Sequence, residues 1–379
     1  MRSSNIGYLP AVDHLRAYAA LLVLAYHGLH VFSHRARFGG EFTPDHWLQP
    51  ANPLLAALAE GHTAVALFMV LSGFILTCGA LDRAVDWRGF IRNRLLRTYP
   101  LFLLLVFAGI AAVPARFEWL AFLQTVGGFA NLPGALSTPP FSSMLWTIAV
   151  EWQFYVIFPL LLAVAKPAWS GRIAGMVLVL VVVRALAVLA GGSARDIGYL
   201  TILGRLDQFL IGMWAAWCFR RHPLGRGAAT GLAALALAVM LAALALSNRA
   251  GGWPTSPPWK VLWPTFEAVG WAAFLLGYVQ AANAARGAWS RLVAAIGTVS
   301  YSIYLTHFVV IHTLATHGWL PFASGHFVRD ALLNTLLVAL PPTLLLATLT
   351  YAFVERPFLR LRGTYHRGAA LPGASHAAP

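Results

Sequence analysis

Charged residues are scarce in this sequence of 379 residues, because Asp, Glu, Lys and Arg together make up only 11% of it. A soluble domain carries about a quarter of its residues as charged side chains. Acidic residues are the rarest, with 13 Asp and Glu against 27 Lys and Arg. Hydrophobic residues account for 59%. This composition excludes an ordinary water-soluble domain and predicts an integral membrane protein.

Cysteine is also scarce. Cys78 and Cys218 lie near predicted cytoplasmic helix ends, where thiols stay reduced, so we expect no disulfide. The first apolar segment contains Asp13, His14 and Arg16 and is followed by no small-residue cleavage site. It is therefore predicted to be a retained helix and not a removable signal peptide.

Long apolar segments run almost from end to end. Because a helix needs roughly 20 apolar residues to cross a bilayer, we expect an all-α polytopic protein with about ten transmembrane helices. They are predicted at 11–31, 61–80, 98–113, 144–165, 171–190, 199–219, 228–246, 261–281, 294–316 and 328–354. Residues 117–132 are too short and interrupted to span and are expected in an external loop. Residues 1–362 form a single expected membrane domain, and 363–379 a disordered cytoplasmic tail.

Arginine falls in alternate joints between the predicted helices. These joints lie at 83–97, at 220–226 and in the tail from 356 to 367. The positive-inside rule makes this side cytoplasmic and predicts both termini inside. The net charge of +14 is thus explained by topology, and no nucleic-acid binding is expected. We expect the protein in the bacterial inner (plasma) membrane.

Ionisable side chains at membrane depth are costly unless they are paired or solvated, so each is a functional candidate. They are Arg16, His27, Glu151, Arg184, Arg205, Asp207, Glu267 and His307. The predicted topology places several of them at or outside the midplane, which favours a shared reaction cavity.

Arg16 and His27 are the sharpest pair. They lie eleven positions apart on the first helix, so they point in directions about 20° apart and differ in height by roughly 16 Å. Acyl-CoA has a matching layout, with phosphates that need cations and a thioester at the end of a long arm. Arg92, Arg94 and Arg97 are expected to complete the phosphate site.

A neutral imidazole is suited to removing a proton from a sugar hydroxyl, which makes His27 the candidate general base. Glu151 is a candidate to orient the imidazole and stabilise its protonated form. Tyr155 lies one helical turn from Glu151 and faces the same way. Tyr155, Asp207, Glu267 and His307 are the candidate substrate-binding residues.

Six motifs resemble the acyltransferase-3 family, integral membrane enzymes that O-acylate envelope and exported carbohydrates. They are DHLRAYAALLVLAYH (Asp13 to His27), LFMVLSGFIL (Leu67 to Leu76), RNRLLRTYP (Arg92 to Pro100), LWTIAVEWQFYVIFP (Leu145 to Pro159), SYSIYLTH (Ser300 to His307) and FVERP (Phe353 to Pro357). The resemblance covers about Tyr8 to Leu361. It implies ten helices, acyl-CoA as the cytoplasmic co-substrate with no permanently bound cofactor, and functional importance for Arg16, His27, Arg94, Arg97 and Glu151.

One position departs from the family pattern. The family often has a second carboxylate directly after the one at Glu151, and this chain has Trp152 there. Larger relatives carry an extra-cytoplasmic esterase-like domain, so we expect this chain to act alone or to pass its acyl group to a separate glycan-assembly protein.

Each of these candidate residues also has a purely structural interpretation. His27 fits a core histidine bonded to a backbone carbonyl, and Arg94 and Arg97 fit a purely topological role. Asp207 with Arg184 or Arg205 fits a neutralising buried pair, and the segment from Ser300 to His307 fits helix packing. The spacing of His307, His312 and His317 has the wrong helical phase for a metal, so no metal site is predicted.

Two functions follow from these residues. The first is acyl transfer, with acetyl as the expected group, from acyl-CoA to a hydroxyl of an envelope polysaccharide or glycolipid. His27 then acts as the base, or takes the acyl group covalently. The second is a proton-coupled transporter of a sugar or lipid-linked substrate that uses Glu151, Asp207, Glu267 and His27 as a relay.

Overall fold

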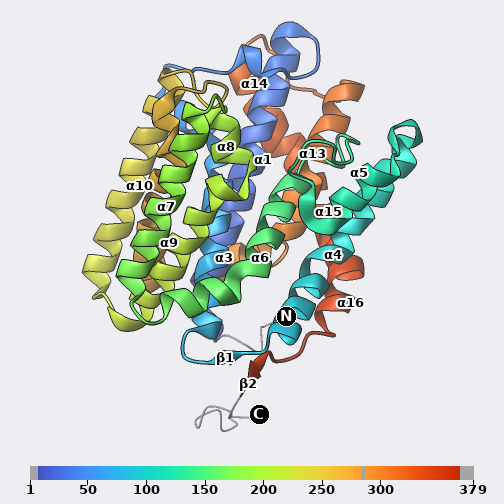
Figure 1. Cartoon of the computed structure of the whole chain (residues 1–379). Coiled ribbons are helices and arrows are strands. Elements are labelled where there is room, and N and C mark those ends of the chain that lie inside the picture. The colour runs from blue at the N-terminus through green and yellow to red at the C-terminus, as the bar shows by residue number, and fades with distance from the viewer. Residues whose placement is uncertain (1–6, 283–286, 368–379) are drawn as a thin grey trace.

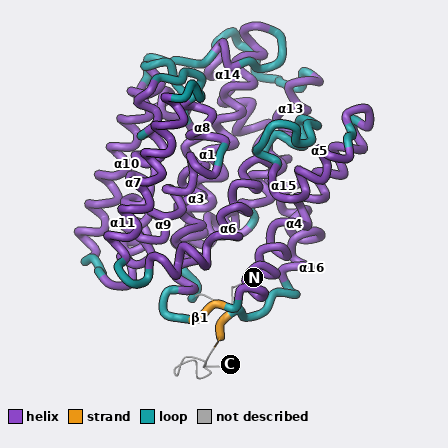
Figure 2. The backbone as a smooth tube through the Cα atoms, in the orientation of Figure 1, coloured by secondary structure: helices purple, strands orange, loops and turns teal. Residues whose placement is uncertain are grey.

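The computed structural model describes residues 7–282 and 287–367, which form a bundle of helices (Figure 1). The longer helices are α1 (Pro10–Phe38), α3 (Ala64–Ala80), α4 (Trp87–Ala112), α6 (Leu145–Ala165), α7 (Trp169–Leu189), α9 (Ile202–Arg221), α10 (Arg226–Arg249), α11 (Trp263–Ala282) and α13 (Ser300–His317). The shorter ones are α2 (Pro53–Ala59), α5 (Trp119–Gln124), α8 (Ala194–Leu200), α12 (Ala288–Thr298), α14 (Phe327–Leu333), α15 (Leu340–Thr350) and α16 (Arg356–Leu359). Figure 2 shows the loops gathered at the two ends of the bundle.

The described part of the chain contains seven helices long and apolar enough to cross a membrane, or eight if the bent pair α12–α13 is one span. One of the seven is the continuous segment Phe327–Leu359, in which α14, α15 and α16 follow one another. The prediction of an all-α integral membrane protein is confirmed. α9 and α11 overlap the predicted spans 199–219 and 261–281 but are not among these seven. Both carry buried polar groups, such as Asp207 and Glu267, that lower their mean hydropathy. The count of ten and the cytoplasmic termini stay predictions.

Three predicted elements differ from the observed ones. α4 begins eleven residues before the predicted 98, because Asp86 caps it by accepting a hydrogen bond from the Gly89 amide (2.9 Å). The span predicted at 294–316 is bent by 68° between α12 and α13. Residues 119–129 are helical instead of an open loop, although this apolar segment is short.

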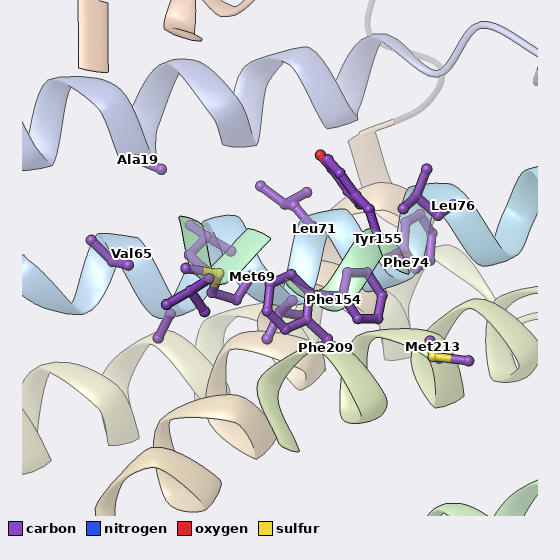
Figure 3. Close-up of a cluster of buried hydrophobic side chains, with 14 of the residues drawn as sticks. Ala19, Val65, Met69, Leu71, Phe74, Leu76, Phe154, Tyr155, Phe209 and Met213 are labelled. Carbon is purple, nitrogen blue, oxygen red and sulfur yellow. The ribbon is translucent and has the colours of Figure 1, made fainter. Parts of the chain in front are cut away.

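The centre of the bundle is built where α3 crosses α9. A β-carbon on Gly73 would lie 2.1 Å from the Phe209 carbonyl oxygen, and one on Gly212 would lie 2.2 Å from that of Val70. Only glycine permits this approach of two backbones. Phe209 also stacks on Phe154 of α6, with ring centroids 4.0 Å apart (Figure 3). In Figure 3 the hydroxyl of neighbouring Tyr155 is directed away from this apolar cluster.

A short ribbon closes one end of the bundle. β1 (Ala84–Val85) pairs antiparallel with β2 (His366–Arg367), and Asn93 of α4 donates to the Gly363 carbonyl at 2.6 Å. Residues 363–367 of the expected tail are thus included in the structure, and 368–379 lie outside the described residues. The boundary at 362 stays a prediction.

Candidate active site

Two adjoining hollows open at the end of the bundle where α1 and α4 begin. They share Arg16, Ile75, Leu76, Arg94 and Arg97, and we call them together the arginine cavity. The outer part measures about 1340 Å³ and the inner part about 830 Å³. The inner part reaches Val65, eleven residues before Leu76 on α3, which is a depth of about 16 Å.

Cations dominate the outer part of the arginine cavity. Arg16, Arg94 and Arg97, all predicted from the sequence, line it, and Arg362 joins them from the segment after α16. Burial and the charges of Arg97, Arg94 and Arg16 lower the pKa of Arg362 to about 10. The buried Nε of Arg94 has no hydrogen-bond partner among the described residues. Four guanidinium groups lining one cavity are suited to binding a polyanion.

Acidic groups neutralise part of this charge. Arg97 donates to Glu355 at 2.6 Å, and Ser302 bonds the other oxygen of that carboxylate. Arg16 contacts Asp13 at 3.3 Å. Arg92, in contrast, is exposed and donates to the Leu361 carbonyl outside the cavity. Its expected contact with phosphate therefore has no support in this geometry.

Glu151 lines the inner part of the cavity. It accepts a hydrogen bond of 2.6 Å from Ser72 and another from Tyr155. The Trp152 that replaces the family's second acid donates to Thr98 at 2.8 Å. Glu151 thus orients groups of the cavity wall, and the structure does not bring it to His27.

His27 pairs with His307 instead. The Nδ1 of His27 lies 3.0 Å from the Nε2 of His307 and 3.1 Å from the Val23 carbonyl oxygen. The Nδ1 of His307 lies 3.1 Å from the Ile303 carbonyl oxygen. Because a carbonyl only accepts, neutral His307 carries its proton on Nδ1, and its bare Nε2 accepts from His27.

This pairing assigns the tautomer of His27. Its Nδ1–H is shared between His307 and Val23, so its Nε2 carries no proton in the neutral ring. That Nε2 makes no hydrogen bond to the described residues. A bare, positioned imidazole nitrogen is what a general base requires.

Aromatic rings connect the histidine pair to the arginine cavity. Tyr304 lines the inner part of the cavity, and its ring centroid lies 5.9 Å from that of His307. Phe68, another lining residue, contacts Tyr304 edge to face at 5.8 Å. Tyr304 therefore separates His307 from the cavity. His27, which is bonded to His307, lines neither part of the cavity and is only partly buried.

Asp207 is part of a different group. Arg184 donates to it at 2.8 Å, and Thr265 donates to the same oxygen. Asp207 and Arg184 are both fully buried and line neither part of the arginine cavity. This arrangement matches the neutralising pair and offers Asp207 no route to a substrate.

Glu267 lies at the opposite end of the bundle, in a cavity of about 370 Å³ that we call the tryptophan cavity. Its residues are Glu60, His62, Ala194, Arg195, Gly198, Tyr199, Arg205, Ser247, Trp253, Lys260, Trp263, Pro264 and Glu267. The four members of the proposed proton relay thus belong to four separate groups, and no hydrogen bond of the described chain connects them.

Glu60 lines the tryptophan cavity and is held by four hydrogen bonds. Its carboxylate accepts from Trp47 (2.7 Å), Asn248 (2.8 Å), His62 (3.0 Å) and the Trp253 amide (3.0 Å). Burial raises the pKa of Glu60, but the bonds from His62, Asn248 and Trp47 outweigh it and leave the pKa below its ordinary value. Sequence inspection missed Glu60, Glu355 and Arg362, although Glu355 stands in the quoted FVERP motif.

The described residues contain no group of three or more His, Cys, Asp or Glu that could hold a metal ion. The fold and the site together define a helical integral membrane protein in which a cationic cavity approaches a pair of bonded histidines. A sequence model described as an acyltransferase domain matches residues 9–354. The chain belongs to this family, acyltransferase-3, as its motifs predicted.

Curated relatives match at low identity. YrhL of Bacillus subtilis (strain 168), named as a suspected peptidoglycan O-acetyltransferase, is 27% identical over 96% of this chain and 56% of its own length. A suspected O-acetyltransferase of Staphylococcus aureus (strain COL) is 23% identical over 93% and 58%. Nodulation protein 10 of Rhizobium leguminosarum bv. viciae is 26% identical over 94% and 95%. The chain thus spans little more than half of the first two relatives. No solved structure matches it.

Proposed function

We propose that this protein is a membrane O-acyltransferase that moves an acyl group, acetyl in the first instance, from acyl-CoA to a hydroxyl of an envelope polysaccharide or glycolipid. The observation that carries the proposal is the arginine cavity, whose inner end meets the His27–His307 pair through Tyr304. Family membership and the name of the B. subtilis relative support the reaction and the envelope acceptor.

The two parts of the cavity suit the two parts of acyl-CoA. Arg16, Arg94, Arg97 and Arg362 would hold the phosphates and the nucleotide at the mouth. The inner part has an apolar wall, formed by residues such as Leu71 and Ile75 of α3, for the pantetheine arm. Its depth of roughly 16 Å would bring the thioester toward the histidine pair.

The chemistry follows from the tautomer of His27. Its bare Nε2 removes the proton of the acceptor hydroxyl as that oxygen attacks the thioester carbonyl carbon. The tetrahedral intermediate then collapses, the carbon–sulfur bond breaks, and the imidazolium returns its proton to the CoA thiolate. His307 stabilises the imidazolium by accepting its Nδ1–H. Glu151 acts as a positioning residue for Ser72 and Tyr155.

The direct test uses the purified full-length chain in lipid nanodiscs with radiolabelled acetyl-CoA and envelope polysaccharide. We expect label on the glycan from the wild type, and a loss of roughly 10²- to 10⁴-fold in His27→Gln. His34→Gln is the matched control, because His34 lies on the same helix and lines neither part of the arginine cavity. Label transfer by His27→Gln at the rate of the wild type would remove His27 from the mechanism.

Transport predicts a different result. A transporter would accumulate substrate in proteoliposomes under a proton gradient and would need no acetyl-CoA. Uptake that collapses with the gradient, together with no label transfer by the wild type, would replace the proposed function.

A further inference from the structure

The tryptophan cavity contains buried polar atoms without partners. They are Oε1 of Glu267, Nη2 of Arg205, Nδ1 of His62 and Nε1 of Trp253, and none has a hydrogen-bond partner among the described residues. Glu267, Arg205 and His62 are 2%, 1% and 5% exposed, and all four residues line the cavity. Buried polar atoms are nearly always bonded, so four in one hollow point to a ligand.

Neighbouring residues hold these groups in place. Arg205 donates to the Tyr199 carbonyl at 2.9 Å and to Gln208 at 3.2 Å, which leaves Nη2 free. Thr63 bonds Glu267. Arg205 and Glu267 form no ion pair with each other in the described chain, although both face the cavity. The site is thus preorganised and its charges are not satisfied internally.

The free atoms offer a mixture of hydrogen-bond roles. His62 gives its Nε2–H to the carboxylate of Glu60, so its Nδ1 is an acceptor when the ring is neutral. Glu267 supplies a second acceptor, while Arg205 and Trp253 supply donors. Hydroxyl groups both donate and accept, so two acceptors and two donors around one hollow match several adjacent hydroxyls better than an anion or a cation.

Aromatic rings wall the same hollow. The rings of Tyr199 and Trp253 lie 5.5 Å apart at 69°, and the Arg205 guanidinium lies over Tyr199 at 4.2 Å. The Arg195 guanidinium lies over Trp253 at 5.1 Å. The wall thus combines aromatic carbon with polar groups, a mixture that suits the C–H and hydroxyl groups of a sugar ring. About 370 Å³ of space, part of it open to solvent, lies between these side chains.

The tryptophan cavity is also close to the proposed base. The Tyr26 ring lies 5.9 Å from His62 of the cavity and 4.6 Å from His27. One ring therefore separates the histidine pair from this cavity, as Tyr304 separates it from the arginine cavity. The pair lies between two hollows that approach it from opposite ends of the bundle.

We propose that the tryptophan cavity is a carbohydrate subsite that binds one sugar ring of the acceptor, with Trp253 and Tyr199 as the aromatic surface and Glu267, Arg205 and His62 bonding its hydroxyls. This assignment rests on the proposed acyl transfer, since it supplies the acceptor that His27 deprotonates. It places donor and acceptor in separate cavities.

The test compares four forms of the full-length chain in nanodiscs: wild type, Trp253→Leu, Glu267→Gln and Trp259→Leu. Trp259 is the matched control, because it belongs to the same loop, is 43% exposed and does not line the cavity. Binding of maltotriose, chitotriose and galactotriose is measured by saturation-transfer NMR without acetyl-CoA. Acetyl transfer to envelope polysaccharide is then measured against acceptor and acetyl-CoA concentration, and the Tm of each form checks folding.

We expect the wild type and Trp259→Leu to bind at least one trisaccharide, and Trp253→Leu and Glu267→Gln to bind it about tenfold more weakly. Acceptor KM should rise by a similar factor while the KM for acetyl-CoA stays unchanged. Binding of none of the three sugars by the wild type, or equal binding by both tryptophan variants, overturns the subsite.

The two proposals fail differently. If the wild type binds a sugar, Trp253→Leu loses that binding, and the wild type transfers no acetyl, the proposed acyltransferase function is wrong and the carbohydrate subsite is supported. If the wild type transfers acetyl and the acceptor KM is unchanged in Trp253→Leu and Glu267→Gln, the acyltransferase function is supported and the carbohydrate subsite is wrong.

Discussion

Replacing His307 by phenylalanine should slow acyl transfer without weakening the binding of acyl-CoA. His307 Nε2 accepts the Nδ1–H of His27 at 3.0 Å, and that bond strengthens when His27 becomes an imidazolium in the transition state. A hydrogen bond to a charged group contributes about 1.5–3 kcal/mol. At about 1.4 kcal/mol per tenfold, kcat should fall by about 10- to 150-fold. His307 is fully buried, and phenylalanine keeps the volume of its ring.

The assay measures initial rates of label transfer from acetyl-CoA over a range of donor concentrations. His307→Gln is the informative partner variant, because the side-chain oxygen of glutamine can accept in place of Nε2 and should restore most of kcat. The KM for acetyl-CoA should match that of the wild type in both variants. A kcat for His307→Phe within about threefold of the wild type, or no recovery in His307→Gln, would refute the reasoning about the tautomer.

Three other predictions follow from the same contacts. Arg362→Gln should raise the KM for acetyl-CoA by about tenfold through loss of a charge-assisted bond, whereas Arg92→Gln, whose side chain lies outside the cavity, should leave it unchanged. The folded pKa of Glu60 lies below its unfolded pKa, so the stability that Glu60 contributes is present above the unfolded pKa and is lost as the pH falls through the folded pKa. The Tm of the wild type in detergent should therefore drop at low pH more steeply than the Tm of Glu60→Gln. Parallel curves of Tm against pH would contradict this prediction. Gly73→Ala should lower the free energy of unfolding by about 1–3 kcal/mol, because its β-carbon would lie 2.1 Å from a backbone oxygen. Gly175→Ala should leave the free energy of unfolding unchanged, because its β-carbon would meet nothing within 4 Å. Equal Tm values for the two variants would count against the close packing of α3 and α9.

Helices were the part of the fold that could be predicted well. Apolar segments of sufficient length predicted the membrane spans of α1, α3, α6, α7 and α10, because lipid exposure forces backbone hydrogen bonds to close within each helix. Helix ends that project into water were predicted poorly. α4 extends beyond its apolar part because a capping aspartate, Asp86, can sustain a helix where hydropathy gives no signal.

The candidate site was predictable only in part. Arg16, Arg94 and Arg97 were identified individually and do line one cavity. Glu151 was expected beside His27 and is bonded to Ser72 instead. Each of these residues can be recognised in the sequence as a charge in an apolar segment, but the sequence does not show which residue it contacts in the folded protein.

Composition and order along the chain determined what this protein is made of: membrane helices, an arginine-rich end, and a basic side chain and an imidazole on one helix face. Those properties are local, because they depend on hydropathy and on a helix repeat of about 3.6 residues. Only the tertiary structure decided that His27 meets His307, 280 residues away, and that two cavities approach this pair. Contacts between distant segments depend on how the helices pack, and close approaches such as that of Gly73 to Phe209 determine the packing.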